Sequence, residues 1–186
     1  YELDSGRLWS VTRETLYPEA GSASMILASK NRLAVAGFSG DEFRVNEQID
    51  IAGNVTSAVS TVDRDNRLVV KTTTRPGVAD PIVVTSHAER RVSRLEPGES
   101  APTLFTHDAL GRQSGEKDPR HVNASTLSYL AGTNLLSSST DAAGHSTAYT
   151  YGASGSAGAG KLVVTTRADG TTIRMAYDLL EREIYR

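Results

Sequence analysis

The stretch that decides the fold, Phe105 to Ser114, reads FTHDALGRQS. It joins a short alternating run to the turn sequence Asp108-Ala-Leu-Gly111-Arg112. Aspartate at the first corner of a turn accepts hydrogen bonds from the backbone amides ahead of it, and glycine at the fourth position adopts the left-handed conformation that returns the chain. The stretch therefore predicts a β-hairpin whose turn contains Asp108, Gly111 and Arg112.

Turn sequences of this kind recur along the chain. Further copies begin at Asp50, Asp63, Asp141 and Asp178, a shortened copy is Asp4-Ser5-Gly6-Arg7, and the residues expected in the left-handed position are Gly53, Asn66 and Gly144. Asn66 is the residue that best replaces glycine in this conformation. Glu181 does not suit it, so we expect the copy at Asp178 to turn differently or to fray.

The segments between these turns have the composition of β-strands. Runs rich in β-branched residues are expected to form strands at 33–38, 43–51, 55–62, 67–74, 81–86 and 161–167. In FRVNEQIDI, the odd positions Phe43, Val45, Ile49 and Ile51 are apolar, and Glu47 interrupts that face once. The best helix candidate, residues 14–21, is cut short by Pro18. The sequence predicts an all-β fold of repeated antiparallel hairpins.

Aromatic residues precede several turns at alternate positions. Tyr149 with Tyr151, and Met175 with Tyr177, would each lie on one face of a strand and would form an aromatic and aliphatic row across neighbouring hairpins. A second interpretation is that exposed tyrosines contact carbohydrate or a protein partner. The candidates for such contacts are Tyr17, Tyr129, Tyr149, Tyr151 and Tyr177.

Composition argues against several classes of function. The 186 residues carry a net charge of −2 with no basic cluster, which argues against nucleic-acid binding, and no apolar run is long enough to span a membrane. The chain has no cysteine. One aspartate per turn supplies too few ligands for a metal ion, so we expect no metal and no cofactor.

No catalytic group is expected either. The histidines are far apart in the sequence, and neighbouring residues such as Ser86 and His87 point to opposite faces of a strand. The run GSAGAGKL, 155–162, has the glycine and lysine spacing of a phosphate-binding loop. It lacks the magnesium-binding hydroxyl and is followed by a strand, so we interpret it as part of a hairpin loop at 152–160.

Together, HDALGR, YDLLER and TDAAGHSTAYTYG resemble the YD repeats of the RHS family, with Gly152 where the repeat has aspartate. The resemblance implies a curved β-strip that forms part of a hollow shell or barrel. Such a shell encloses a toxin domain or presents a surface for adhesion. In this interpretation 1–186 is one β-repeat domain and a fragment of a longer protein, with 1–48 as a degenerate or capping part and 49–186 as repeat-like hairpins.

The resemblance also sets the expectations about function. It implies a non-catalytic structural segment of a secreted or cell-surface protein. The expected partners are the remainder of the parent chain and an encapsulated toxin domain. The alternative is an adhesion module that binds carbohydrate or a cell-surface protein. An isolated repeat strip also exposes strand edges, so we expect edge-to-edge self-association.

Overall fold

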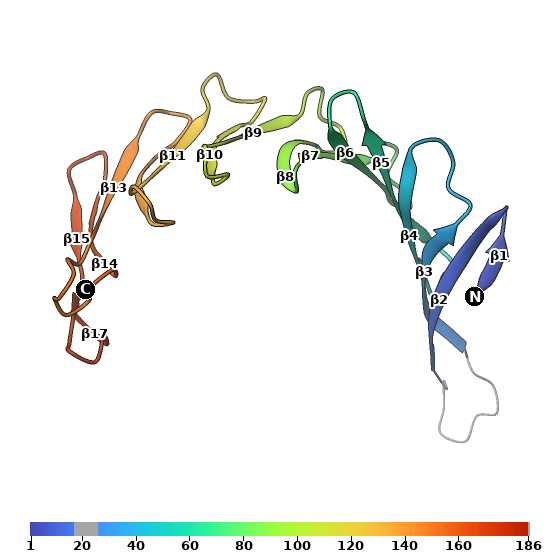
Figure 1. Cartoon of the computed structure of the whole chain (residues 1–186), viewed down its shortest axis with the longest axis horizontal. Coiled ribbons are helices and arrows are strands. Elements are labelled where there is room, and N and C mark those ends of the chain that lie inside the picture. Colours follow the sequence, from blue (N-terminus) through green and yellow to red (C-terminus); the bar gives the residue numbers. More distant parts are fainter. Residues whose placement is uncertain (17–25, 186) are drawn as a thin grey trace. The chain divides into compact units, whose positions relative to one another are not determined.

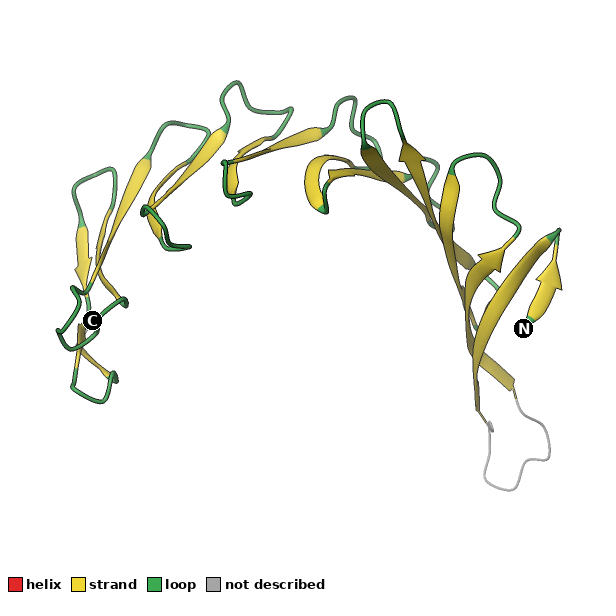
Figure 2. Cartoon of the chain, viewed as in Figure 1, coloured by secondary structure: helices red, strands yellow, loops and turns green. Residues whose placement is uncertain are grey.

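The computed structural model describes residues 1–16 and 26–185. Figure 2 shows strands, turns and loops in this part of the chain and no helix. The contacts divide the chain into two compact units, 1–102 and 103–186. The predicted all-β class of repeated antiparallel hairpins is confirmed.

Unit 1 is a sheet in which strands follow chain order, and Figure 1 shows β2 beside β3 and β3 beside β4. Its strands are β1 Glu2–Asp4, β2 Arg7–Leu16, β3 Ile26–Ala36, β4 Glu42–Asp50, β5 Val55–Asp63, β6 Leu68–Thr74, β7 Ile82–His87 and β8 Arg90–Leu95. Every pairing between successive strands is antiparallel. The first four strands therefore belong to the same sheet as the turns that resemble the repeat.

Unit 2 follows the same rule with shorter strands. They are β9 Thr103–His107, β10 Gln113–Lys117, β11 Ser125–Tyr129, β12 Leu136–Thr140, β13 Ser146–Tyr151, β14 Leu162–Thr166 and β15 Thr172–Arg174, followed by a separate pair, β16 Ala176–Tyr177 and β17 Glu183–Tyr185. Alternate residues of β9, β11 and β13 are half-buried and exposed. This is the period of two that places aromatic residues on one face.

The six strands expected from composition are present as β3 to β7 and β14, with ends shifted at most seven residues from the expected ones. The helix candidate is wrong in its described part, because Glu14 to Leu16 belong to β2. These residues pair with Ser29, Leu27 and Ile26 of β3, so the ladder supplies their backbone hydrogen bonds. Residues 17–21 of that candidate, including Tyr17, lie outside the described residues.

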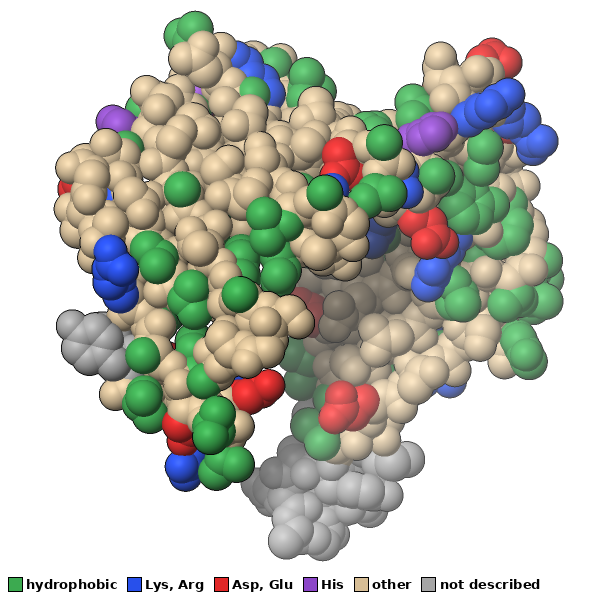
Figure 3. All heavy atoms as spheres, turned by 60° about the vertical axis from the view of Figure 1, so that its left-hand side comes forward, with side chains coloured by type: hydrophobic (Ala, Val, Ile, Leu, Met, Phe, Trp, Pro, Cys, Tyr) green, Lys and Arg blue, Asp and Glu red, His purple; other side chains and the backbone are tan. Residues whose placement is uncertain are grey.

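The core of unit 1 is small. Trp9, Ala34 and Val45 form its buried cluster, with Val11 and Val59 packed against them. Many large apolar side chains remain exposed, including Tyr1 at 88% and Leu3 at 76%. Figure 3 accordingly shows hydrophobic side chains spread among polar ones across the visible face. The strands are joined by continuous backbone ladders, so the sheet does not depend on this small cluster alone.

Ion pairs cover the face of unit 1 that holds Trp9. Arg32 Nε lies 2.5 Å from Glu47 Oε2, Arg32 Nη1 lies 2.7 Å from Asp4 Oδ2, and the guanidinium of Arg32 is 4.4 Å from the centre of the Trp9 ring. Glu47 thus interrupts the apolar face of β4 with a charge that pairs with Arg32 on the neighbouring strand β3. Phe43 is 47% exposed, next to a bulge between Glu42 and Arg44 that breaks the expected apolar row.

Candidate functional site

The recurring feature of the molecule is a five-residue turn with one hydrogen-bond pattern. In the turn 108–112, the Asp108 amide donates to the Arg112 carbonyl at 2.9 Å, and the Gly111 amide donates to the Asp108 carbonyl at 2.9 Å. The Asp108 carboxylate oxygen Oδ1 accepts from the amides of Leu110 and Arg112 at 2.9 and 3.0 Å. The same pattern occurs in the turns that begin at Asp50, Asp141 and Asp178.

The fifth residue of each turn uses the second carboxylate oxygen. Its side chain contacts Oδ2 of the first residue in all four turns, through Asn54 at 2.9 Å, Arg112 at 2.6 Å, His145 at 3.1 Å and Arg182 at 2.7 Å. Sequence reasoning assigned the first and fourth positions but missed the role of the fifth. The sequence does contain a signal for this role: in every copy, the residue after the fourth position has a side chain with an N–H donor.

Two details of the expected turns are wrong. Glu181 adopts φ 61 and makes the same backbone bonds as Gly111, because the bonds around Asp178 supply enough energy to hold a non-glycine residue there. In the Asp63 copy the left-handed residue is Arg67, φ 57, rather than Asn66. Asp63 pairs directly with Leu68, so this loop has four residues, and the last of them, Arg67, adopts the left-handed conformation that reverses the chain. Asn66 instead donates to the Asp63 carboxylate.

The turn hydrogen bonds lower the pKa of the turn aspartates. For Asp50 and Asp108 the largest cause is the side chain of the fifth residue, Asn54 or Arg112. For Asp141 and Asp178 it is the backbone amide of the fifth residue. The folded turn therefore favours the charged carboxylate, which is the form that accepts every one of these bonds.

This shift predicts acid lability. An unfolded aspartate has a pKa of about 3.9, so the stabilisation is complete above that pH and is lost as the pH falls through the lower folded values. We expect the urea midpoint of the chain to fall between pH 5 and pH 2, about the range in which aspartates titrate. Asp108→Asn should lower the midpoint at neutral pH and reduce its pH dependence. An unchanged pH dependence in Asp108→Asn would contradict the assignment.

The structure reveals a period that the turn sequences alone conceal. On one side of unit 2, the first residues of successive turns are Asp108, Leu130, Gly152 and Asp178, so the first two intervals are 22 residues and the third is 26. Each is directly preceded by a ring: His107, Tyr129, Tyr151 and Tyr177. Alternate hairpins, rather than consecutive ones, are therefore equivalent.

Two of these tyrosines join one turn to the next on the same side. The Tyr129 hydroxyl donates to the Gln113 carbonyl at 2.7 Å, and the Arg112 guanidinium lies 4.3 Å from the centre of its ring. Arg112 also donates to the carbonyl of Thr133 in the following turn. We call this arrangement a tyrosine clasp.

The second tyrosine clasp has the same parts. The Tyr177 hydroxyl donates to the Leu162 carbonyl at 3.1 Å, and the Lys161 ammonium lies 5.6 Å from the centre of the ring. Lys161 also pairs with Glu181 at 3.3 Å. Glu181 is the fourth residue of its turn, as Thr133 is in the first clasp. In both clasps the last residue of one turn is a cation that holds the fourth residue of the next.

Gly152 begins an expanded turn in place of aspartate. Its amide donates to the Lys161 carbonyl at 2.9 Å, as in the short turns, and Gly160 donates back to the Gly152 carbonyl at 2.9 Å. A Cβ at Gly152 would lie 2.2 Å from the Gly158 oxygen. The loop therefore excludes aspartate here by close backbone approach. The amides of Ser156, Ala159 and Lys161 also donate to carbonyls of the same loop.

The other predicted residues lie in strands or neighbouring turns. Gly53 and Gly144 both have the expected positive φ, 82 and 91. The Tyr149 hydroxyl lies 3.0 Å from the Ser139 hydroxyl, and Tyr151 is half-buried on the same face of β13. The hydroxyls of Tyr129, Tyr149 and Tyr177 thus have partners within unit 2.

The left-handed residue of the turn gives a direct test. We expect Gly111→Val to destabilise unit 2 by about 1–2 kcal/mol or more, because Gly111 has φ 82 and a β-branched side chain resists it. Arg112→Ala should cost less, because it removes side-chain contacts with Asp108, Thr133 and Tyr129 but leaves the backbone conformation of the turn without strain. Urea denaturation followed by far-UV circular dichroism compares the two. Equal midpoints would contradict the turn assignment.

No protein-family model matches the chain, and no curated protein matches it. The resemblance to the YD repeats of the RHS family therefore depends on the residue pattern. Within residues 1–16 and 26–185, no group of three or more histidine or acidic side chains is arranged to hold a metal ion. The same residues include no helix long and apolar enough to cross a membrane.

Proposed function

We propose that the chain is a non-catalytic structural segment of an RHS-type protein and contributes wall to a β-shell. The observation that carries the proposal is the repetition of the aspartate turn and the tyrosine clasp. These groups bond to side chains and backbone of their own or a neighbouring turn, so their hydrogen bonds hold the turns together. Hairpins joined in chain order extend a sheet one unit at a time, as a wall requires.

The proposal includes the setting of the protein. The wall belongs to a secreted or cell-surface protein, its partners are the rest of its own polypeptide, and the enclosed volume holds a toxin domain. A wall of this kind needs no catalytic residue of its own. Exposed apolar side chains such as Leu3 and Leu104 support this role, because other parts of a larger assembly would cover them.

The test is small-angle X-ray scattering on the natural polypeptide that contains these residues, with the 186-residue chain measured alongside. A hollow particle gives a pair-distance distribution weighted toward large separations, and we expect this result. A solid, compact profile would overturn the wall and favour adhesion. Light scattering of the 186-residue chain adds a second readout, since exposed strand edges should make it associate as its concentration rises.

A further inference from the structure

The strongest unexplained feature is a polar groove in unit 1, with a volume of about 500 Å³. It lies on β2 to β5, and its lining residues Asn31, Asn46 and Gln48 are on the face opposite the Trp9 cluster, because they alternate with Arg32, Val45 and Glu47 along β3 and β4. Arg32 and Glu47, which pair with each other, also contribute to the lining. The wall proposal uses neither this groove nor its residues.

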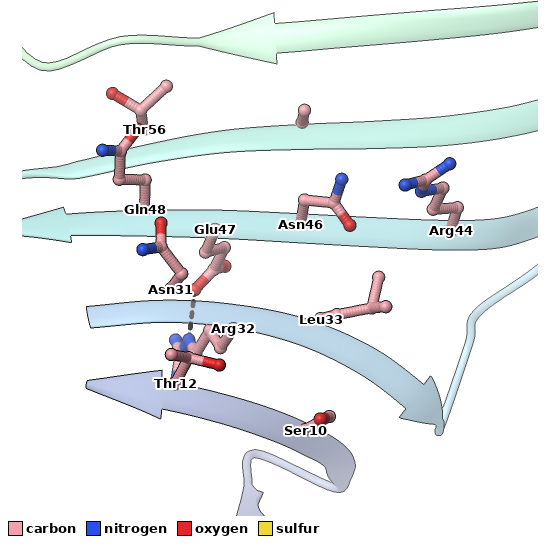
Figure 4. Close-up of a pocket in the computed structure, with 11 residues that line it drawn as sticks. Ser10, Thr12, Asn31, Arg32, Leu33, Arg44, Asn46, Glu47, Gln48 and Thr56 are labelled. Carbon is pink, nitrogen blue, oxygen red and sulfur yellow. Dashed lines mark hydrogen bonds and ion pairs between the residues drawn. The ribbon is translucent and has the colours of Figure 1, made fainter. Parts of the chain in front are cut away.

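The register of the strands aligns polar side chains across the groove. Thr12 is opposite Asn31, Asn31 is opposite Gln48, and Gln48 is opposite Thr56. Figure 4 shows Asn31, Gln48 and Thr56 following one another across neighbouring strands. Because adjacent strands are about 4.8 Å apart, hydroxyl and amide groups form a ladder that runs across the strands.

The cationic side chains on the two faces of this sheet differ in whether they have an acidic partner. On the Trp9 face, Arg32, Lys30 and Arg7 all pair with acidic side chains. In the groove, the Asn46 Oδ1 atom is buried without a hydrogen-bond partner. Arg44 is exposed and has no acidic partner within the described part of the chain. The groove thus retains hydrogen-bonding capacity and one positive charge for a ligand.

These groups define the chemistry of the ligand. Amide side chains both donate and accept, which matches the hydroxyl groups of sugars, and an arginine binds a carboxylate through two parallel hydrogen bonds. Leu33 and Ala58 add small apolar surface for the C–H groups of a sugar ring. We infer that the groove binds an acidic oligosaccharide that lies across β2 to β5, with a uronic-acid carboxylate on Arg44. This inference does not depend on the wall role.

Isothermal titration calorimetry of the 186-residue chain tests the groove, with an oligogalacturonate as the acidic probe and a malto-oligosaccharide of equal length as the neutral one. We expect the acidic probe to bind more tightly. Arg44→Ala and Gln48→Ala should each weaken binding, and the loss for Arg44→Ala should be about tenfold or more, as for a charge-assisted hydrogen bond. Arg64→Ala is the matched control, because it removes the same charge from an 80% exposed side chain outside the groove.

Three results would overturn the inference. The first is no binding of the acidic probe, and the second is equal affinity for the neutral probe. The third is an equal loss in Arg64→Ala and Arg44→Ala, which would indicate attraction by net charge alone. Tryptophan fluorescence from Trp9 verifies that each variant is folded, and Gln48→Ala keeps the test decisive if Arg44→Ala does not fold. Failure here would leave the scattering test of the wall unaffected.

Discussion

Trp9→Ala is expected to destabilise unit 1 by about 3–5 kcal/mol, as for other buried tryptophans replaced by alanine. Trp9 is 3% exposed and is the largest member of a buried cluster that, among the described residues, contains Ala34 and Val45 as its other members. So small a core has little material to close the resulting cavity. The substitution also removes the ring that the guanidinium groups of Arg7 and Arg32 contact, at 5.6 and 4.4 Å from its centre.

Urea denaturation followed by far-UV circular dichroism measures this effect, because Trp9 is the only tryptophan and its fluorescence disappears with it. Trp9→Phe should cost less than Trp9→Ala, since it keeps a ring and removes an indole N–H that is buried without a partner. Tyr1→Ala is the control, as an 88% exposed side chain should change stability by about 0.5 kcal/mol at most. A loss in Trp9→Ala no larger than the control would show that the core lies elsewhere.

Gly37→Ala is the second large effect that we expect. Gly37 has φ +80, and an added Cβ would lie 2.4 Å from the Gly6 oxygen and 2.7 Å from Arg7 Cα. Both neighbours are backbone atoms, so the hairpin of β1 and β2 would have to move away from the loop between β3 and β4. That movement would also strain the bond from Arg7 Nε to the Gly37 carbonyl, 3.2 Å.

Gly40→Ala is the matched control for this prediction. Gly40 also has positive φ, +58, but a Cβ there would meet nothing within 4 Å. Both variants carry the cost of a left-handed alanine, about 1–2 kcal/mol, and only Gly37→Ala adds the steric clash, about 1–3 kcal/mol more. Trp9 fluorescence during urea denaturation follows unit 1 in both. Equal losses would mean that the two loops do not approach as closely as described.

Sequence reasoning predicted the parts of the fold that local chemistry controls. Asp108 and Gly111 identified their hairpin because an aspartate cap and a left-handed glycine act within five residues. It failed at Glu14 to Leu16, where pairing with β3 decides the conformation. It also failed at Glu181 and Arg67, whose left-handed conformations depend on the complete set of turn bonds and on the loop length.

The sequence by itself determined the all-β class, the aspartate turns and the tyrosines that precede them, because these follow from period and turn chemistry over a few residues. Only the tertiary structure decided which hairpins are equivalent, since the partners in the clasp of Tyr129 with Gln113 are 16 residues apart. The same is true of the polar groove, whose ladder joins Thr12 to Thr56 through strand register. Contacts between residues so far apart in the chain depend on the register of several strand pairs in succession, which the buried face and the turns of all these hairpins set together.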